Sequence, residues 1–92
     1  MPRPGAGRSR ADTPDQDDIV ASFGANLKAA RLKAGLTQAQ LADAAGLLQQ
    51  YVSLVESGKQ NVTLTTAQTL ARVVNRDVRT LLTRAKTPTF KR

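Results

Sequence analysis

Apolar residues recur every three or four positions along much of the chain, the spacing that places them on one face of a helix. The first such run consists of Ile19, Phe23, Leu27, Ala30 and Ala34. Thr13 and Pro14 precede it as an N-cap and a first helical residue, with Gln16 completing a capping box. Gly24 interrupts the run and costs about 1 kcal/mol relative to alanine. We therefore predict a first helix that starts at Thr13 and ends at Gly35, since glycine commonly terminates helices.

Two short helices with almost no connection between them are predicted next. Thr37 and Gln40 have the spacing of a second capping box, and Gly46 ends that helix. The next helix begins almost at once and ends at Gly58. The predicted inward positions are Leu41, Ala42 and Ala45 in the first of these helices, and Leu48, Val52 and Val55 in the second. Helices joined so closely meet at a steep angle, which is the geometry of a helix-turn-helix.

Two more short helices complete the pattern. Thr63 caps one that ends at Asn75 in a left-handed conformation, and Asp77 caps the other, which Pro88 keeps from continuing. Their inward positions are Leu64, Ala67, Leu70, Ala71 and Val74, then Val78, Leu81 and Leu82. The chain lacks β alternation of useful length, so we predict an all-α domain of five short helices over residues 13–83. Residues 1–12 are predicted to form a disordered arm, and residues 84–92 a basic tail.

The composition excludes several classes of chemistry. The chain contains neither cysteine nor histidine, which removes disulfides, zinc-finger spacing and histidine-based acid–base catalysis. It also lacks paired carboxylates in a pocket-forming pattern and a glycine-rich phosphate loop. We therefore expect no enzymatic activity, no metal and no cofactor. Because no apolar run approaches the roughly 20 residues that span a bilayer, we expect a cytoplasmic protein without membrane contact.

The charge favours a polyanionic partner. The net charge is +7, and residues 19–82 alone contain seven basic and three acidic residues. The last ten residues add four basic side chains and no acidic ones. Only three residues are aromatic, so the stacking side chains typical of RNA-binding proteins are missing. Charge alone leaves two interpretations open, binding to nucleic acid or simple solubility.

The segment TQAQLADAAGLLQQYVSLVESGK decides between them, because it resembles the helix-turn-helix of the lambda-repressor/Cro-type family, also called the xenobiotic-response-element family. The resemblance extends from Phe23 to Leu82. Its matching features include Gly35-Leu36-Thr37-Gln38, Leu41-Ala42, Ala45-Gly46, Val55-Glu56, Gly58-Lys59 and Leu70-Ala71. The resemblance implies a compact five-helix lambda-repressor-like domain whose second motif helix enters the major groove of double-stranded DNA.

That helix runs from about Gln49 to Ser57. By resemblance, Gln49 and Gln50 match positions that touch bases, and a glutamine amide pairs bidentately with adenine. Ser53 shares their face, and Leu54 occupies a position that sometimes reads bases. The alternative is that two surface glutamines only keep the helix soluble. Leu54 and the N-cap Leu48 depart from the family pattern, and the unmet cap at Leu48 costs about 1 kcal/mol.

Other residues match family positions near the DNA backbone. Gln38 matches a phosphate-binding residue at a helix start, where free N–H groups favour an anion. Lys59, Asn61 and Tyr51 match positions beside the groove. Arg31 matches a residue that pairs with a glutamate, here Glu56, and that also lies near a phosphate.

The resemblance further implies a homodimer, since one such motif reads only half of a site. The predicted dimer contacts are the apolar residues Val74, Val78, Leu81 and Leu82, some of which also close the core. We thus expect a transcriptional regulator, a repressor in the first instance, that binds a palindromic operator at the nucleoid. The alternative is an antitoxin-type interaction module that neutralises a toxin partner and autoregulates its operon.

Overall fold

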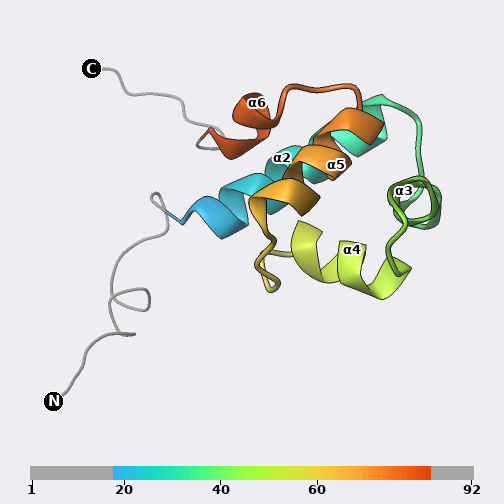
Figure 1. Ribbon diagram of the computed structural model, residues 1–92, viewed down its shortest axis with the longest axis horizontal. Helices are drawn as coiled ribbons and strands as arrows, with labels where there is room; N and C mark the ends of the chain where they lie inside the picture. The colour runs from blue at the N-terminus through green and yellow to red at the C-terminus, as the bar shows by residue number, and fades with distance from the viewer. Residues whose placement is uncertain (1–17, 84–92) are drawn as a thin grey trace, which may run out of the picture.

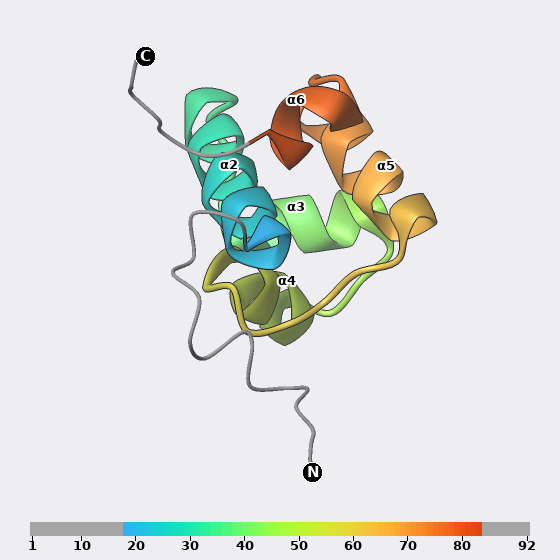
Figure 2. The same ribbon diagram turned by 90° about the vertical axis from the view of Figure 1, so that its left-hand side faces the viewer.

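The computed structural model describes residues 18–83, and over this range the chain is all-helical, which confirms the predicted fold class (Figure 1). No strand occurs among these residues. The helices are α2 (Ile19–Lys33), α3 (Gln38–Ala45), α4 (Gln49–Glu56), α5 (Leu64–Val73) and α6 (Val78–Leu82). Figures 1 and 2 both show α4 along one edge of the molecule and α6 at the opposite edge.

The start of α2 differs from the prediction. Asp18 is its N-cap, and the carboxylate oxygen Oδ1 accepts hydrogen bonds from the backbone N–H groups of Val20 (3.0 Å) and Ala21 (3.2 Å). The helix therefore begins at Ile19, because aspartate satisfies N–H groups that the first turn leaves free. Thr13 and Pro14, the predicted cap and first residue, lie outside the described residues.

The remaining caps confirm the sequence interpretation. Thr37 and Gln40 form the predicted capping box at the start of α3. Gly46 ends α3 in the left-handed conformation (φ 72°), and Asn75 adopts the same conformation (φ 61°) after α5. At Gly46 this conformation turns the chain directly into the next helix, so that the Leu47 N–H donates back into α3. The corner between α3 and α4 is thereby fixed.

The core is built almost entirely from small and aliphatic side chains. Its fully buried members are Leu27, Leu41, Leu70, Leu81, Val52, Val55 and Val74, with Phe23, Ala30, Ala42, Ala67 and Ala71 nearly as buried. Four predicted inward positions are wrong. Ile19, Leu48 and Leu64 are exposed by 54%, 77% and 76%, and Ala34, the C-cap of α2, is exposed as well. Ile19 and Leu64 are the first residues of their helices, and Leu48 is an N-cap. Side chains lean toward the helix N-terminus, so apolar residues at that end project past the packed turns.

Gly24 controls how closely α2 and α4 pack. It is buried in the middle of α2, and a β-carbon built on it would overlap the main-chain carbonyl oxygen of Val55. From the sequence alone, Gly24 was expected only to weaken the helix. The structure shows the compensating gain, because the absent side chain lets the two helices approach at the end of α4.

Candidate nucleic-acid interface

Helix α4 has one face in the core and one in solvent. Val52 and Val55 are exposed by 0% and 1%, and they fix the helix against the rest of the domain. Gln49, Gln50 and Ser53 are exposed on the other side, as the amphipathic pattern predicted. An exposed row of hydrogen-bonding side chains on a rigidly held helix suits the reading of base edges. Their contact with DNA stays a prediction.

The N-terminal end of α4 lacks a side-chain cap. Leu48 is the N-cap in extended conformation, and it makes no side-chain hydrogen bond to the helix. Leu54, further along α4, is half-buried and so offers only part of its side chain to a ligand. The absence of a hydroxyl-bearing residue at position 48 therefore leaves the start of α4 without a side-chain cap.

A buried ion pair ties α4 to α2. The Arg31 Nε donates to Glu56 Oε2 at 2.7 Å, and its Nη2 donates to Glu56 Oε1 at 3.0 Å. A third guanidinium nitrogen, Nη1, donates to the carbonyl oxygen of Leu36 at 2.8 Å. The side chains of Arg31 and Glu56 are exposed by only 8% and 3%, so this bidentate pair is shielded from solvent. The predicted structural pair is present.

This pairing bears on the second role predicted for Arg31. Three of its five guanidinium N–H donors are used within the domain, and its side chain is exposed by only 8%. Its structural role is therefore present, and its contact with the DNA backbone stays a prediction. Sequence alone could not separate the two roles, because both require the same positive charge at the same place.

Gln38 joins the same network from α3. Its side-chain Nε2 donates to Glu56 Oε1 at 3.0 Å, which links the first helix of the motif to the second. One N–H of the amide is used in this way, which leaves its second N–H and the backbone N–H groups at the start of α3 for a phosphate. The predicted phosphate contact remains a prediction, but its chemistry is narrower than a free glutamine would allow.

The other predicted backbone-contacting residues lie on α4 and in the loop after it. The Tyr51 hydroxyl lies 3.5 Å from the carbonyl oxygen of Asn61, a long hydrogen bond that joins α4 to the loop. The side-chain Oδ1 of Asn61 accepts from the Val62 N–H at 3.0 Å. Lys59 is exposed, so its ammonium is accessible to an anion. Lys59 and Asn61 follow the C-terminal end of α4, whereas Tyr51 lies in its first turn beside the two glutamines.

The predicted dimer contacts divide into two groups. Val74 and Leu81 are exposed by 1% and 2% within a single chain, so they belong to the core and cannot form a surface. Val78 and Leu82 are half-buried and keep part of their side chains accessible. The expectation that some of the four residues close the core is thus met by two of them.

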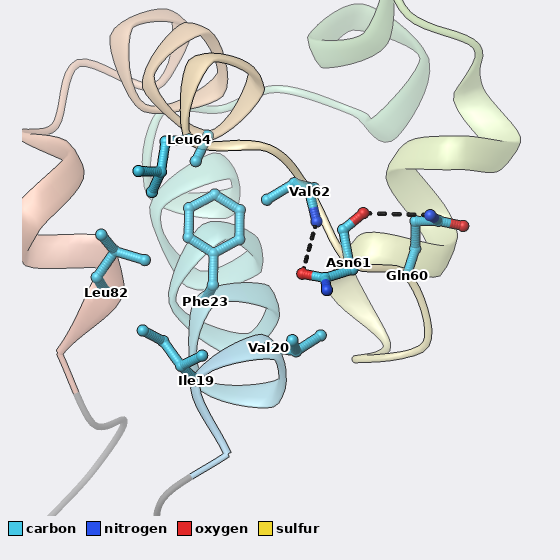
Figure 3. A pocket seen from close by; sticks show the side chains of 9 residues that line it. Ile19, Val20, Phe23, Gln60, Asn61, Val62, Leu64 and Leu82 are labelled. Atoms are coloured by element: carbon cyan, nitrogen blue, oxygen red, sulfur yellow. Dashed lines mark hydrogen bonds between the residues drawn. The ribbon is translucent and has the colours of Figure 1, made fainter. Parts of the chain in front are cut away.

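A small apolar cavity opens beside Leu82 (Figure 3). It has a volume of about 180 Å³, and Figure 3 shows Phe23 in its centre with Ile19, Leu64 and Val62 around it. Its walls come from α2, the loop before α5, α5 itself and α6. Sequence reasoning missed this cavity because it had assigned Ile19 and Leu64 to the core.

The most perturbed carboxylate lies away from α4. The side chain of Arg79 hydrogen-bonds to Asp77 (Nη2 to Oδ2, 2.8 Å), and the Arg79 backbone N–H donates to the same carboxylate. These bonds lower the pKa of Asp77 from 3.8 to about 2, because they stabilise its ionised form. The pair is exposed at the start of α6, so the lowered pKa reflects first the side-chain hydrogen bond from Arg79 and then the capping bond, and does not mark a reactive site.

Two features are absent from residues 18–83. No group of three or more histidine, cysteine, aspartate or glutamate side chains is arranged to hold a metal ion there. No helix in the same range is long and apolar enough to cross a bilayer.

Comparisons with known proteins agree on one family. The sequence profile described as helix-turn-helix matches residues 27–81, which includes α3, α4 and α5. The control protein C.SmaI of Serratia marcescens is 40% identical over 75 residues, covering 77% of this chain and 89% of that protein. Both lines of comparison match the segment that contains Gln49 and Gln50.

Two solved structures are also similar. The restriction-modification controller protein C.AhdI of Aeromonas hydrophila superposes with a TM-score of 0.64 at 37% identity, covering 67% of this chain and 94% of that one. The hypothetical transcription factor NHTF of Neisseria gives a TM-score of 0.73 at 30% identity, covering 80% of this chain and 85% of that one.

Proposed function

Because the chain belongs to the Cro/C1-type helix-turn-helix family of DNA-binding transcription regulators, we propose that it binds a palindromic operator as a homodimer. In this proposal α4 of each copy enters the major groove of one half-site. The observation that carries it is the two-sided character of α4. Val52 and Val55 anchor one side completely, and Gln49 and Gln50 are exposed on the other.

Gln49 and Gln50 are the proposed base-reading residues. Each amide offers a donor and an acceptor, the pair that matches the N6 and N7 edge of adenine. Ser53 and the exposed part of Leu54 are proposed as secondary base contacts on the same helix. Lys59, Asn61 and Tyr51, with the N-terminal end of α3 at Gln38, are proposed to lie along the phosphates.

Among regulators of this family, we favour a controller of a restriction–modification system. C.AhdI is named as a restriction-modification controller and C.SmaI as a control protein, and both are at least 37% identical to this chain. Repression of the promoter next to the operator is the expected mode of action. The antitoxin alternative requires a bound toxin, and the relatives named above do not favour it.

The surface around the apolar cavity is proposed as the dimer contact. Of the predicted dimer residues, Leu82 lines that cavity, and the exposed side chains of Ile19 and Leu64 stand at its rim. A second copy would cover these apolar groups through a self-complementary contact. Val78, at the other end of α6, does not line the cavity, and its predicted dimer contact stays a prediction.

Selection of bound sequences from a random duplex pool tests the proposal. We expect enrichment of a palindrome whose half-site centres lie about 34 Å apart, one helical turn. Enrichment of single, unpaired half-sites would contradict the homodimer, and failure to enrich any sequence would contradict the function.

Variants of the selected complex test the assigned roles. Gln49→Ala or Gln50→Ala should weaken operator binding by about 1–3 kcal/mol and leave binding to random DNA almost unchanged. Lys59→Ala should weaken both and reduce the salt dependence. Gln68→Ala, an exposed glutamine on α5, is the matched control and should change neither. Equal losses on operator and random DNA for the α4 glutamines would remove them from base reading.

A further inference from the structure

Leu48 is the most exposed large apolar residue in the part of the chain that the structure describes. The residue is exposed by 77%, although the spacing of apolar residues predicted an inward position. It precedes Gln49 directly and forms the N-cap of α4 in extended conformation (φ −81°, ψ 144°). The side chain therefore stands at the end of the recognition helix from which bases are read.

This leucine is locally unfavourable in two ways. Serine, threonine, asparagine or aspartate at this position would accept a hydrogen bond from the helix, which leucine cannot do. Its isobutyl group also gains nothing from burial, because it remains in water. Residues that break local rules without a packing gain are expected where function requires them.

No other apolar surface of the domain accounts for Leu48. It is absent from the core and from the half-buried residues packed against the core, whereas its neighbour Leu47 is among them. It also does not line the cavity assigned to the dimer contact. Nor does leucine supply the donor that a hydroxyl cap offers to a phosphate.

We propose that Leu48 selects thymine in the operator half-site by packing against its 5-methyl group. The inference rests on the proposed function, since it requires α4 in the major groove. The thymine methyl is the apolar group that base pairs display there, and apolar side chains recognise it by contact. The bound base then covers a side chain that the folded protein leaves exposed.

Replacement of thymine by deoxyuridine tests this directly, because it removes the methyl group and keeps the hydrogen-bonding pattern. Each thymine of the selected operator is replaced in turn, and binding of the full chain is measured. One position per half-site should weaken wild-type binding about fourfold for the lost methyl contact. Leu48→Ser should lose this sensitivity, while Leu48→Met, which stays apolar, should retain it.

Two further measurements separate a reading role from a structural one. Leu48→Ser supplies the missing cap, so its thermal midpoint should rise even as its affinity for the thymine operator falls. Leu32→Ser, a change at an exposed leucine of α2, is the matched control and should leave the deoxyuridine profile unchanged.

The inference is overturned if wild type and Leu48→Ser give the same deoxyuridine profile. A selected half-site that contains no thymine overturns it equally. In both cases the proposed function stands, because the operator is still bound. If the chain selects no DNA at all, the proposed function fails and this inference fails with it.

Discussion

The ion pair of Arg31 and Glu56 is the most shielded polar contact in the described part of the chain. It draws in Gln38 and the carbonyl of Leu36, so that four groups from α2, α3, α4 and the turn after α2 share one network. Burial of two charges brings little net stability, but loss of one partner leaves the other unpaired out of water. Its main effect is to fix where α4 lies.

Removal of one partner should therefore be costly. We expect Glu56→Ala to lower the free energy of unfolding by about 3–5 kcal/mol, measured by urea denaturation. Arg31→Met combined with Glu56→Leu should recover most of that loss, because no unpaired charge remains. Arg79→Ala, which breaks an exposed pair, is the control and should change stability little. A loss for Glu56→Ala no larger than that of Arg79→Ala would contradict the shielding described above.

The lowered pKa of Asp77 predicts how the contribution of this residue to stability depends on pH. The Asp77 carboxylate should titrate near pH 2 instead of 3.8 when followed by the ¹³C shift of its carboxyl carbon. Since the folded state lowers this pKa, the capping contribution to α6 is fully present above about pH 4 and is lost as the pH falls through about 2. In Arg79→Gln the midpoint should move up toward 3.8, and an unchanged midpoint would exclude the arginine as cause.

At the scale of helices, the sequence predicts caps better than packing. Thr37, Gln40 and Thr63 cap through their own side chains, so a local pattern is sufficient to find them. Leu48 and Leu64 were predicted to face the core but are exposed. The spacing of apolar residues does not show which of them lie at a helix start, beyond the part of the helix that packs on the core. The amphipathic face of α4 was predicted, since its anchors and its glutamines alternate within one short helix. The ion pair was identified by resemblance, but its burial required the fold.

For a substitution at Gly24, helix propensity and the packing of α2 against α4 predict opposite changes in stability. Helix propensity alone predicts that Gly24→Ala stabilises α2 by about 1 kcal/mol. The overlap with the Val55 carbonyl instead predicts a net loss of about 1–3 kcal/mol, because neither backbone can move without separating α2 from α4. Thermal and urea unfolding both measure the sign.

A variant at the neighbouring residue separates the effect of helix propensity from the effect of packing. Ala25→Gly, at the exposed neighbouring position, should cost about 1 kcal/mol through propensity alone. Stabilisation by Gly24→Ala would mean that the helices separate freely. Displacement of α4 should also reduce operator affinity in Gly24→Ala and leave it intact in Ala25→Gly.

At the scale of the whole molecule, the proposed dimer depends on a few apolar side chains at one side of the fold. Burial of one leucine contributes about 1.5–3 kcal/mol, so Leu64→Glu should weaken self-association roughly 10- to 100-fold in sedimentation experiments. Binding to a full palindrome should fall with it, while binding to an isolated half-site should not. Leu32→Glu, on the same molecule but away from the cavity, should leave both unchanged. Equal effects of the two variants would locate the contact elsewhere.

The close approach at Gly24 also bears on how operators diverge. Because α4 is held against α2 there and through Glu56, we expect the proposed recognition helix to tilt little when a base pair changes. If Gln49 and Gln50 read bases as proposed, adjustment falls to rotation about their side-chain bonds, since each amide can present its donor and acceptor in either orientation. Such a protein is expected to tolerate single-base drift that exchanges a donor for an acceptor, and to reject an added or deleted base pair between half-sites. Over evolutionary time the operators of such a protein should therefore change in base sequence while the spacing between their half-sites stays the same.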